Sequence, residues 1–514
     1  MRDWLAPGRA GWRADLAAAG LGALSALALP PLHLLPVLLL AVPGLLRLAG
    51  PQPGFRRLFR LGWWFGFGHH LLGLYWITEA ILIEVARFWW LVPLAVPALA
   101  AYMALFMAAA WGMAALAAPG WRRGAMLAGA WVLADIARQF ALSGFPWNPW
   151  GSAWAIPGLA GDIALQPAAL IGVHGLSLVT VWLAALPASA RAPGGRGAVL
   201  ASAALVLAWL GYAALRLAAP APQGTGVAVA LIQGNVDQRE RLDNVRAAAV
   251  FRRYLDLTRA AALQADAATL AVIWPESASP FWLEEDPDAR RAIALAGTAV
   301  PGRRVLTLAG TVRGGTDRRI RNSLLVIDAL AEPRGVYDKW HLVPFGEYDP
   351  PWSPLPIQIV PGGGFTPGPG PRTLAPPGLP AFGPLICYEV IFPGEILDRA
   401  ARPAWLVNVT NDAWFGNSTG PRQHLAAARL RAVEERLPLF RAANTGISAA
   451  YDARGRELGR IALNQEGILV RDLPGAQAPE LFARFGLAVP ALLAGVALLL
   501  GVATPQRKIR YQSA

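Results

Sequence analysis

The sequence predicts two parts of different physical character: an α-helical transmembrane bundle of about eight spans, and an α/β domain on the outer face of the membrane. Only 15% of the 514 residues are charged and 55% are hydrophobic, whereas a soluble globular domain has about 25% charged residues. The apolar residues are concentrated in two stretches, 13–218 and 480–503. We therefore expect the bundle in residues 1–220, the α/β domain in 221–478, and a last transmembrane helix with a cytoplasmic tail in 479–514.

The net charge of +13 does not by itself indicate a nucleic-acid partner. Arginines clustered on one folded domain would be typical of such a partner, but here many of them interrupt hydrophobic runs, which is typical of membrane topology. The single cysteine, Cys387, excludes an internal disulfide. Residues 26–28 loosely fit a signal-peptide cleavage site. Further apolar spans follow at once, however, so we expect an uncleaved first anchor.

A helix needs about 20 apolar residues to cross the hydrocarbon core of a membrane. The first two candidate spans are short and are separated by Pro30 and Pro31, so their ends are the least well defined. The candidate spans cover about 13–30, 34–50, 60–82, 90–118, 124–141, 166–190, 197–218 and 481–503.

Basic residues are found at every second connection between these spans. The loops near 31–34, 83–89 and 142–165 lie between the basic ones and carry almost no positive charge. Because short loops rich in Lys and Arg stay in the cytoplasm, we expect both termini to be cytoplasmic and residues 219–479 to lie outside. The basic connections contain Arg2, Arg9 and Arg13; Arg47, Arg56, Arg57 and Arg60; Arg122 and Arg123; Arg191 and Arg196; and Arg507, Lys508 and Arg510.

A few ionisable residues fall inside or at the ends of spans. Asp135 and Arg138 are three residues apart on one expected helix, and Glu79 and Glu84 lie near the outer end of another. One interpretation is an intrahelical ion pair with interfacial carboxylates. The other is that Arg138 binds a lipid phosphate.

From residue 226 the pattern changes to short β-rich runs that alternate with amphipathic helices, which suits a layered α/β domain with buried sheets. The stretch 349–380 is dense in Pro and Gly, so we expect a long irregular loop there. Strands are expected at 227–233, 270–276, 304–312, 323–328, 382–388, 405–410 and 447–451. Helices are expected at 239–264, 287–297, 393–401 and 421–436.

Three local patterns contain residues that could do chemistry, at 273–277, 337–348 and 385–389. Glu276 and Cys387 each close an apolar, strand-like run. Sheet ends are where α/β folds expose catalytic groups, so both side chains should reach a shared rim.

Lys339 and Lys508 are the only lysines in a chain that otherwise uses arginine. A lysine at position 339 therefore suggests a site that needs a compact ammonium instead of a planar guanidinium. Taken one at a time, a lone cysteine is more often a small buried hydrophobe, Glu276 could cap a helix, and Lys339 could be solvated. Their occurrence together favours catalysis.

These patterns resemble the nitrilase superfamily, whose Glu–Lys–Cys triads occur in this chain order on an α-β-β-α sandwich. With membrane spans before the domain and one after it, the whole chain is similar to the bacterial apolipoprotein N-acyltransferase family. The most specific stretches are 233–235 (Gln-Gly-Asn), 339–348, 387–389 (Cys-Tyr-Glu) and 411–416 (Asn-Asp-Ala-Trp-Phe-Gly).

The resemblance implies that Glu276 is the base, Lys339 the electrostatic partner and Cys387 the nucleophile. It also implies that Glu347, Tyr388 and Glu389 support the site. One departure concerns the segment after residue 235, where family members often carry a proline and then Trp-Asp. Asp237 and Leu242 stand at those places, so a substrate contact of that Trp cannot be transferred to this chain.

For the activity, the resemblance implies transfer of an acyl chain from a phospholipid, through a thioester on Cys387, to the N-terminal amine of a diacylglyceryl-cysteine lipoprotein. It implies no cofactor, a monomer, and a multi-pass protein of the bacterial inner membrane with its catalytic domain in the periplasm. Loop aromatics such as Trp414 and Phe415 could dip into the interface and gate acyl chains. They could equally be packed within their loops.

Three other readings remain open. A membrane-anchored amidase with the same triad would release the acyl group to water. A lipase is suggested by residues 416–420 (Gly-Asn-Ser-Thr-Gly), although the last histidine, His424, lies too close to that serine. A transporter with a degenerate outer domain would keep its function without Cys387. Metal chemistry is not expected, because the six histidines show no two-plus-one spacing with carboxylates.

Overall fold

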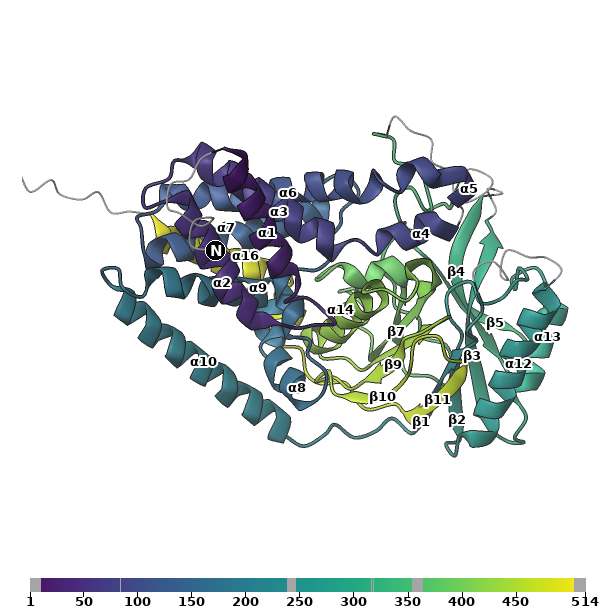
Figure 1. Ribbon diagram of the computed structural model, residues 1–514. Coiled ribbons are helices and arrows are strands. Elements are labelled where there is room, and N and C mark those ends of the chain that lie inside the picture. The colour runs from purple at the N-terminus through teal and green to yellow at the C-terminus, as the bar shows by residue number, and fades with distance from the viewer. Residues whose placement is uncertain are drawn as a thin grey trace, which may run out of the picture.

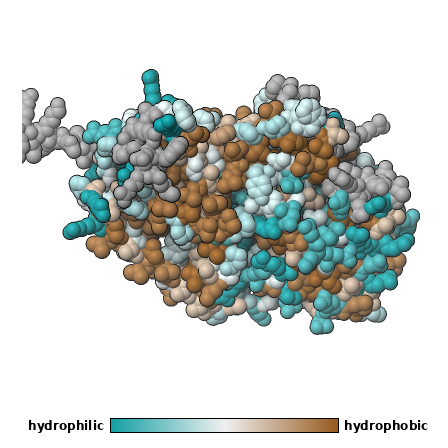
Figure 2. Space-filling view, in the orientation of Figure 1, coloured by the Kyte–Doolittle hydropathy of each residue, from teal (hydrophilic) through white to brown (hydrophobic). Residues whose placement is uncertain are grey.

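The computed structural model describes residues 11–83, 85–237, 246–315, 317, 319–353 and 364–502. A helical bundle and an α/β domain lie side by side in these residues (Figure 1). Figure 2 shows predominantly hydrophobic residues on the surface of the bundle and predominantly hydrophilic ones on that of the α/β domain. The uneven composition along the chain thus corresponds to two different surfaces.

The bundle is built from the first part of the chain and from its last helices. α3 packs against both α1 and α6, and α7 packs against both α9 and α16. A Cβ on Gly22 would lie 1.8 Å from the carbonyl oxygen of Phe65, so α1 and α3 approach too closely for a side chain there; small residues at crossings are typical of membrane helices. The segments are α1 (Trp12–Ala26), η1 (Leu35–Val37), α2 (Leu38–Ala49), α3 (Phe55–Gly73), α4 (Ile77–Ile83), α5 (Val85–Phe88), η2 (Trp89–Leu91), α6 (Ala95–Met113), η3 (Ala114–Leu116), α7 (Trp121–Phe140), η4 (Trp150–Trp154), α8 (Leu159–Leu165), α9 (Ala168–Ser189), α10 (Gly195–Ala218), α15 (Leu481–Phe485) and α16 (Ala488–Gly501).

Helices form at each expected span, but a count of eight membrane spans is not confirmed. In the described part of the chain, three helices are long and apolar enough to cross a membrane: Ala95–Leu116, Ala168–Ser189 and Gly195–Ala218. α2 has 12 residues and α16 has 14, and the span expected at 60–82 is divided between α3 and α4. Only 11% of the apolar window in α10 is buried, and this helix runs along the outside of the bundle (Figure 1).

The α/β domain contains two sheets. The six-stranded sheet has the order β11-β1-β2-β3-β4-β5, and the five-stranded sheet has the order β10-β9-β8-β7-β6. In each sheet three consecutive strands are parallel, β1-β2-β3 and β6-β7-β8, and the flanking strands are antiparallel. The strands are β1 (Val227–Gln233), β2 (Thr269–Ile273), β3 (Arg304–Gly314), β4 (Ile320–Asp328), β5 (Pro333–Asp338), β6 (Phe382–Ile386), β7 (Trp405–Thr410), β8 (Leu439–Ala443), β9 (Ser448–Tyr451), β10 (Glu457–Ile461) and β11 (Gly467–Asp472).

Alternate side chains of each central strand face different layers. On β1, Leu231 belongs to the core between the two sheets, whereas Ile232 belongs to the core under α12 (Ala247–Gln264) and α13 (Pro287–Gly297). α14 (Gly420–Glu435) and the five-stranded sheet share a third core on the other side. The domain is therefore the α-β-β-α sandwich that the resemblance implied.

The expected strands at 227–233 and 405–410 and the expected helix at 287–297 are confirmed to the residue. The helix expected at 393–401 is wrong: those residues form bends and turns, and Gly394 has a φ of 78° that a helix cannot contain. The first residues of the helix expected at 239–264 lie outside the described residues. Four strands were not anticipated, β5, β8, β10 and β11; each contains an arginine and has at most three consecutive apolar residues.

Candidate active site

Glu276 lies three residues beyond the end of β2, in the turn that follows it. Its two carboxylate oxygens have different partners. Oε1 accepts a hydrogen bond from Nδ2 of Asn322 at 2.7 Å, and Oε2 accepts one from the backbone N–H of Asn411 at 2.9 Å. The side chain is buried, so these donors from both sheets hold the carboxylate in one position.

Lys339 follows β5 directly, and its side chain is only 1% exposed. Nζ lies 2.8 Å from the carboxylate of Glu347 and 3.4 Å from Oε1 of Glu276. Burial acts to lower the pKa of Lys339, but Glu347 and Glu276 outweigh it and the pKa is raised above its ordinary value. The side chain of Lys339 is therefore an ammonium ion that lies between the carboxylates of Glu276 and Glu347.

Cys387 follows β6 directly and begins the short helix η5 (Cys387–Ile391). Its φ of 50° lies in the left-handed region, where strained residues are found at active sites. Burial and then the charge of Glu276 raise the pKa of the thiol, while Lys339 acts to lower it. Two distant parts of the chain thus act electrostatically on this sulfur, and the resting thiol needs a base before it can attack.

Glu347 and Asn322 complete the surroundings of the ammonium. Asn322 Nδ2 also donates to Oε1 of Glu347 at 3.1 Å, and the backbone N–H of Val343 donates to Oε2 at 2.8 Å. Asn322 therefore joins the two carboxylates that flank Lys339, and one amide keeps both at a fixed separation.

Glu389 connects the segment after Lys339 to the segment around Cys387. It accepts hydrogen bonds from the backbone N–H of Trp340 at 2.8 Å, from that of Ile386 at 2.6 Å and from the hydroxyl of Tyr337 at 2.9 Å. Burial raises the pKa of this carboxyl to about 7. The side chain of Glu389 thus connects the loop after Lys339 to the end of β6, next to Cys387.

The bundle also contributes to the site, through the corner Ser143–Gly144 that follows α7. The hydroxyl of Tyr388 donates to the carbonyl of Gly144 at 2.6 Å, and that of Tyr348 donates to Oγ of Ser143 at 2.8 Å. Nε2 of His341 lies 3.1 Å from the carbonyl of Ser143. Each of these residues is adjacent, or nearly so, to Cys387, Glu347 or Lys339, so the bundle touches all three active-site segments.

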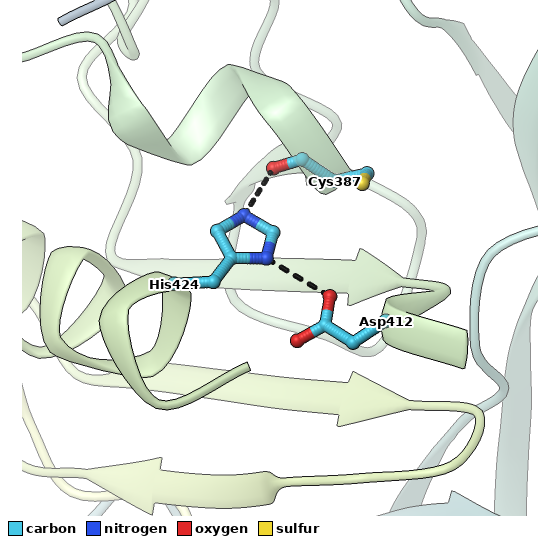
Figure 3. A group of neighbouring side chains, drawn as sticks. All are labelled: Cys387, Asp412 and His424. Carbon is cyan, nitrogen blue, oxygen red and sulfur yellow. Dashed lines mark hydrogen bonds and ion pairs between the residues drawn. The ribbon is translucent and has the colours of Figure 1, made fainter. Parts of the chain in front are cut away.

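Cys387 also belongs to a buried group with Asp412 and His424, whose ligand-type atoms all lie within 4.8 Å of one another. Nδ1 of His424 lies 2.9 Å from Asp412 Oδ1, and Nε2 lies 3.1 Å from the backbone carbonyl of Cys387. In Figure 3 the sulfur points away from the imidazole. The histidine is thus bonded to the main chain of Cys387 and to a carboxylate, and its ring presents no free nitrogen to a metal ion or to the thiol.

The remaining predicted residues have less direct relations to this group. Trp414 is half-buried on η6 (Asp412–Phe415), and its neighbour Phe415 stacks edge-on against Trp76 of the bundle with ring centroids 4.5 Å apart. Ser418, the serine of the lipase reading, donates to the carbonyl of Phe415 at 2.6 Å. The packing interpretation of Phe415 therefore has a direct contact in its favour.

Arg138 is paired with Asp135, as the ion-pair interpretation expects, with Nε 2.9 Å from Oδ1. Nη1 donates to the carbonyl of Trp147 at 2.8 Å, and the side chain is 3% exposed. A lipid phosphate would find no exposed guanidinium at this position. Glu84 and Leu242 lie outside the described residues.

Sequence reasoning missed the residues that hold the site together. Nothing in the local patterns of Asn322 and His424 distinguishes them from ordinary polar residues. Asn411 lies in the stretch 411–416 that carries the resemblance, but no role was assigned to it. Arg441 is the exception, because an arginine inside the short apolar strand β8 signals a buried charge. It pairs with Asp412 at 2.5 Å.

Comparison with known proteins gives the following matches. A family model described as carbon-nitrogen hydrolase matches residues 228–480, and one described as apolipoprotein N-acyltransferase N-terminal domain matches residues 21–186. The chain is 41% identical to the apolipoprotein N-acyltransferase of Bradyrhizobium diazoefficiens, over 96% of this chain and 95% of that protein. It is 39% identical to that of Allorhizobium ampelinum, over 92% of each. Among solved structures, an amidase from Nesterenkonia sp. is 22% identical with a TM-score of 0.36, over 50% of this chain and 93% of the amidase.

Proposed function

This chain belongs to the apolipoprotein N-acyltransferase family, and on that basis we propose that it transfers an acyl chain from a phospholipid, through a thioester on Cys387, to the N-terminal amine of a diacylated lipoprotein. The chain is an acyltransferase of lipoprotein biosynthesis. The observation that supports the chemical route is the convergence of Glu276 and Lys339 on the buried thiol.

In the first half-reaction Glu276 takes the thiol proton as the sulfur of Cys387 attacks the ester carbonyl of the phospholipid. The negative charge that develops on the carbonyl oxygen is stabilised by the ammonium of Lys339 and by a backbone N–H next to Cys387. Each well-placed donor contributes about 3 kcal/mol to such a transition state. The C–O ester bond then breaks, and the lysophospholipid leaves with the proton from Glu276.

In the second half-reaction the α-amine of the lipoprotein attacks the thioester carbonyl. Glu276 accepts the amine proton, the C–S bond breaks, and the thiolate is reprotonated as the amide product leaves. Because the acyl group is held covalently between the two substrates, ping-pong kinetics are expected.

Three supporting roles belong to this proposal. Glu347 holds the charge and position of Lys339, Glu389 fixes the two loops that carry the triad, and Tyr388 anchors the nucleophile to the bundle. Trp414 lies on the same short helix as Asp412, beside the site, where it could line the path of the acyl chain. We assign no substrate contact to Arg138.

The chain is a membrane protein, as its relatives are and as its apolar helices indicate. We place it in the bacterial inner membrane, with the catalytic domain in the periplasm and both termini in the cytoplasm, because basic residues occur at every second connection. The corresponding division is 1–220, 221–478 and 479–514. One chain supplies the whole triad, so a monomer is sufficient.

The test is to follow the acyl group. Purified enzyme mixed with phosphatidylethanolamine should gain one acyl mass on the peptide that contains Cys387, and a diacylated lipopeptide should then discharge it into an amide. Cys387→Ser is the matched control and should gain no hydroxylamine-labile acyl mass. Acylation at another residue, or none in the active wild-type enzyme, would contradict the thioester route. Discharge to free fatty acid alone would support the amidase, which the acyltransferase relatives do not favour.

A further inference from the structure

His424 is a buried histidine that has no role in the steps of acyl transfer proposed above. It lies on the first turns of α14, is 1% exposed, and bonds through Nε2 to the carbonyl oxygen of Cys387 at 3.1 Å. The carbonyl of Cys387 and the N–H of Tyr388 belong to the same peptide group. The contact is therefore made to the backbone of the nucleophile and not to its thiol (Figure 3).

The imidazole is held rigidly from its other side. Asp412 Oδ1 lies 2.9 Å from Nδ1 and also accepts a hydrogen bond from the hydroxyl of Thr410 at 2.8 Å. Asp412 Oδ2 pairs with Arg441 at 2.5 Å, and Arg441 in turn donates to the side chain of Asn408. Nη2 of Arg441 also lies 3.2 Å from Nδ1. A neutral imidazole carries its proton on one nitrogen only, so with Nδ1 accepting from this guanidinium the proton is on Nε2. These contacts pass across β7 and β8 in the sheet core, so the ring cannot rotate without losing its contact with a carboxylate that a fully buried ion pair holds in place.

Two aromatic side chains, Trp147 and Phe415, pack against the imidazole and also against each other, with 5.9 Å between their own ring centroids. The ring of Trp147 from the bundle lies 5.5 Å from the imidazole, and that of Phe415 lies 5.9 Å from it. Water is thus kept from the hydrogen bond to Cys387, and a hydrogen bond in such a low-dielectric site is stronger than the same bond in water.

We propose that His424 is a positioning residue for acyl transfer: its Nε2–H fixes and polarises the Cys387–Tyr388 peptide, so that the N–H of Tyr388 is presented to the oxyanion. The proposal rests on the proposed function, since it takes Cys387 as the nucleophile. In a planar trans peptide the C=O and the N–H point in opposite directions. The carbonyl of Cys387 points to His424, whereas the sulfur points away from it (Figure 3), so the N–H is turned to the side of the reacting atom.

Tyr388 is the second residue of the short helix η5, where backbone N–H groups have no acceptor within the helix. The hydroxyl of Tyr388 donates to the carbonyl of Gly144, which fixes the side chain. The direction of the backbone N–H is set instead by the orientation of the peptide plane. A donor that withdraws charge from the carbonyl makes the N–H of the same peptide a stronger donor. His424 therefore acts on the oxyanion through one rigid peptide and does not touch the substrate.

Two substitutions of His424 by side chains of similar length distinguish the effect of the hydrogen bond to Cys387 from the effect of packing. In His424→Gln the amide nitrogen occupies the position of Nε2 and can donate to the carbonyl, while in His424→Met a flexible apolar chain of similar length fills the space without a donor. The readout is the single-turnover acylation of Cys387 from mixed micelles that contain phosphatidylethanolamine. The mass of the protein, measured over time, gives the extent of acylation. We expect the rate at saturating phospholipid to fall by about 10- to 100-fold in His424→Met. In His424→Gln it should stay within severalfold of wild type, and the phospholipid concentration for half-saturation should change little in either.

Equal rates in the Gln and Met variants, whether both are lost or both retained, would overturn the proposal, because donation would then make no difference. If His424→Met does not fold, His424→Asn replaces it: this amide reaches the position of Nδ1 and not that of Nε2, and so cannot donate to the carbonyl. Failure of this inference is distinguishable from failure of the proposed function. In the first case wild-type Cys387 is still acylated, and in the second it is not.

Discussion

Two of the buried groups of charged side chains among the described residues are built differently: the proposed catalytic group in the α/β domain and an ion pair in the bundle. In the catalytic group a single ammonium, Lys339, lies between the carboxylates of Glu276 and Glu347. In the bundle group a single guanidinium, Arg138, pairs with a single carboxylate, Asp135. Formally, the first group carries one surplus negative charge and the second carries none.

The difference extends to hydrogen bonding. Each carboxylate of the catalytic group accepts at least two hydrogen bonds, and Asn322 serves both. In the bundle group, the described residues offer no hydrogen-bond partner to Oδ2 of Asp135 or to either ring nitrogen of the neighbouring His174. The catalytic group is thus a rigid arrangement with a surplus negative charge, which suits a base about to accept a thiol proton. In the bundle group the two charges cancel, so that neither is buried without a counter-charge.

The most severe test of this contrast is Glu276→Gln. The substitution removes the proposed base and leaves Lys339 paired with Glu347, so the buried group becomes neutral. We expect the turnover number to fall by about 10³-fold, within the range for general-base catalysis, while the thermal unfolding temperature stays the same or rises. The measurements are lipopeptide acylation and unfolding in the same detergent. A variant that lost stability in proportion to activity would contradict the assignment of a surplus charge.

The converse test is Asp135→Asn in the bundle. This substitution leaves the guanidinium of Arg138 buried without its counter-charge, and breaking a buried pair on one side costs about 3–5 kcal/mol of stability. The double variant Asp135→Asn/Arg138→Met should recover part of the loss, because neither charge then remains. Unfolding temperatures of the two variants make the comparison. If the double variant were the less stable of the two, the pair would not act through neutrality.

A pH test addresses Glu389, the buried carboxyl whose pKa is raised to about 7 by burial. A carboxyl with a raised pKa binds its proton more tightly in the folded than in the unfolded protein, where the ordinary value is about 4.3. Its contribution to stability is therefore full below that value and is lost as the pH rises to about 7. We expect the decline in unfolding temperature between pH 5 and pH 7 to be shallower in Glu389→Gln. The same slope as wild type would be the contrary result, and Glu332→Gln, at an exposed position, is the control.

The smallest effect is expected at an exposed ion pair. Arg291 and Asp288 are paired on the surface of α13, with side chains 64% and 86% exposed. Because water and salt screen such pairs, Arg291→Gln should change stability by less than about 0.5 kcal/mol. A loss as large as that of Asp135→Asn would show that the cost of Asp135→Asn comes from losing a charge pair and not from leaving a charge buried without a partner.

Local pattern was sufficient for β1 and β7, which are rich in Val and Leu, and it singled out the three residues proposed as the triad. Glu276 and Cys387 close apolar runs, and Lys339 stands out in a chain that prefers arginine. Pattern failed at β8, where Arg441 interrupts the apolar residues, and at 393–401, where Gly394 turns the chain. In both places a single residue has a partner or a backbone angle that only the folded chain reveals.

The sequence alone was enough to determine the two-part organisation and the positions of the helices in the bundle, and it singled out the residues proposed to carry the chemistry, because each of these depends on neighbours within a few residues. The tertiary structure decided which side chains surround them. Asn322 between two carboxylates, His424 on the carbonyl of Cys387, and Ser143–Gly144 beneath Tyr388 and Tyr348 all join segments far apart in the chain. Hydrogen bonds depend on distances of about 3 Å, and no spacing along the chain sets such distances between segments that meet only when both sheets and the bundle have packed.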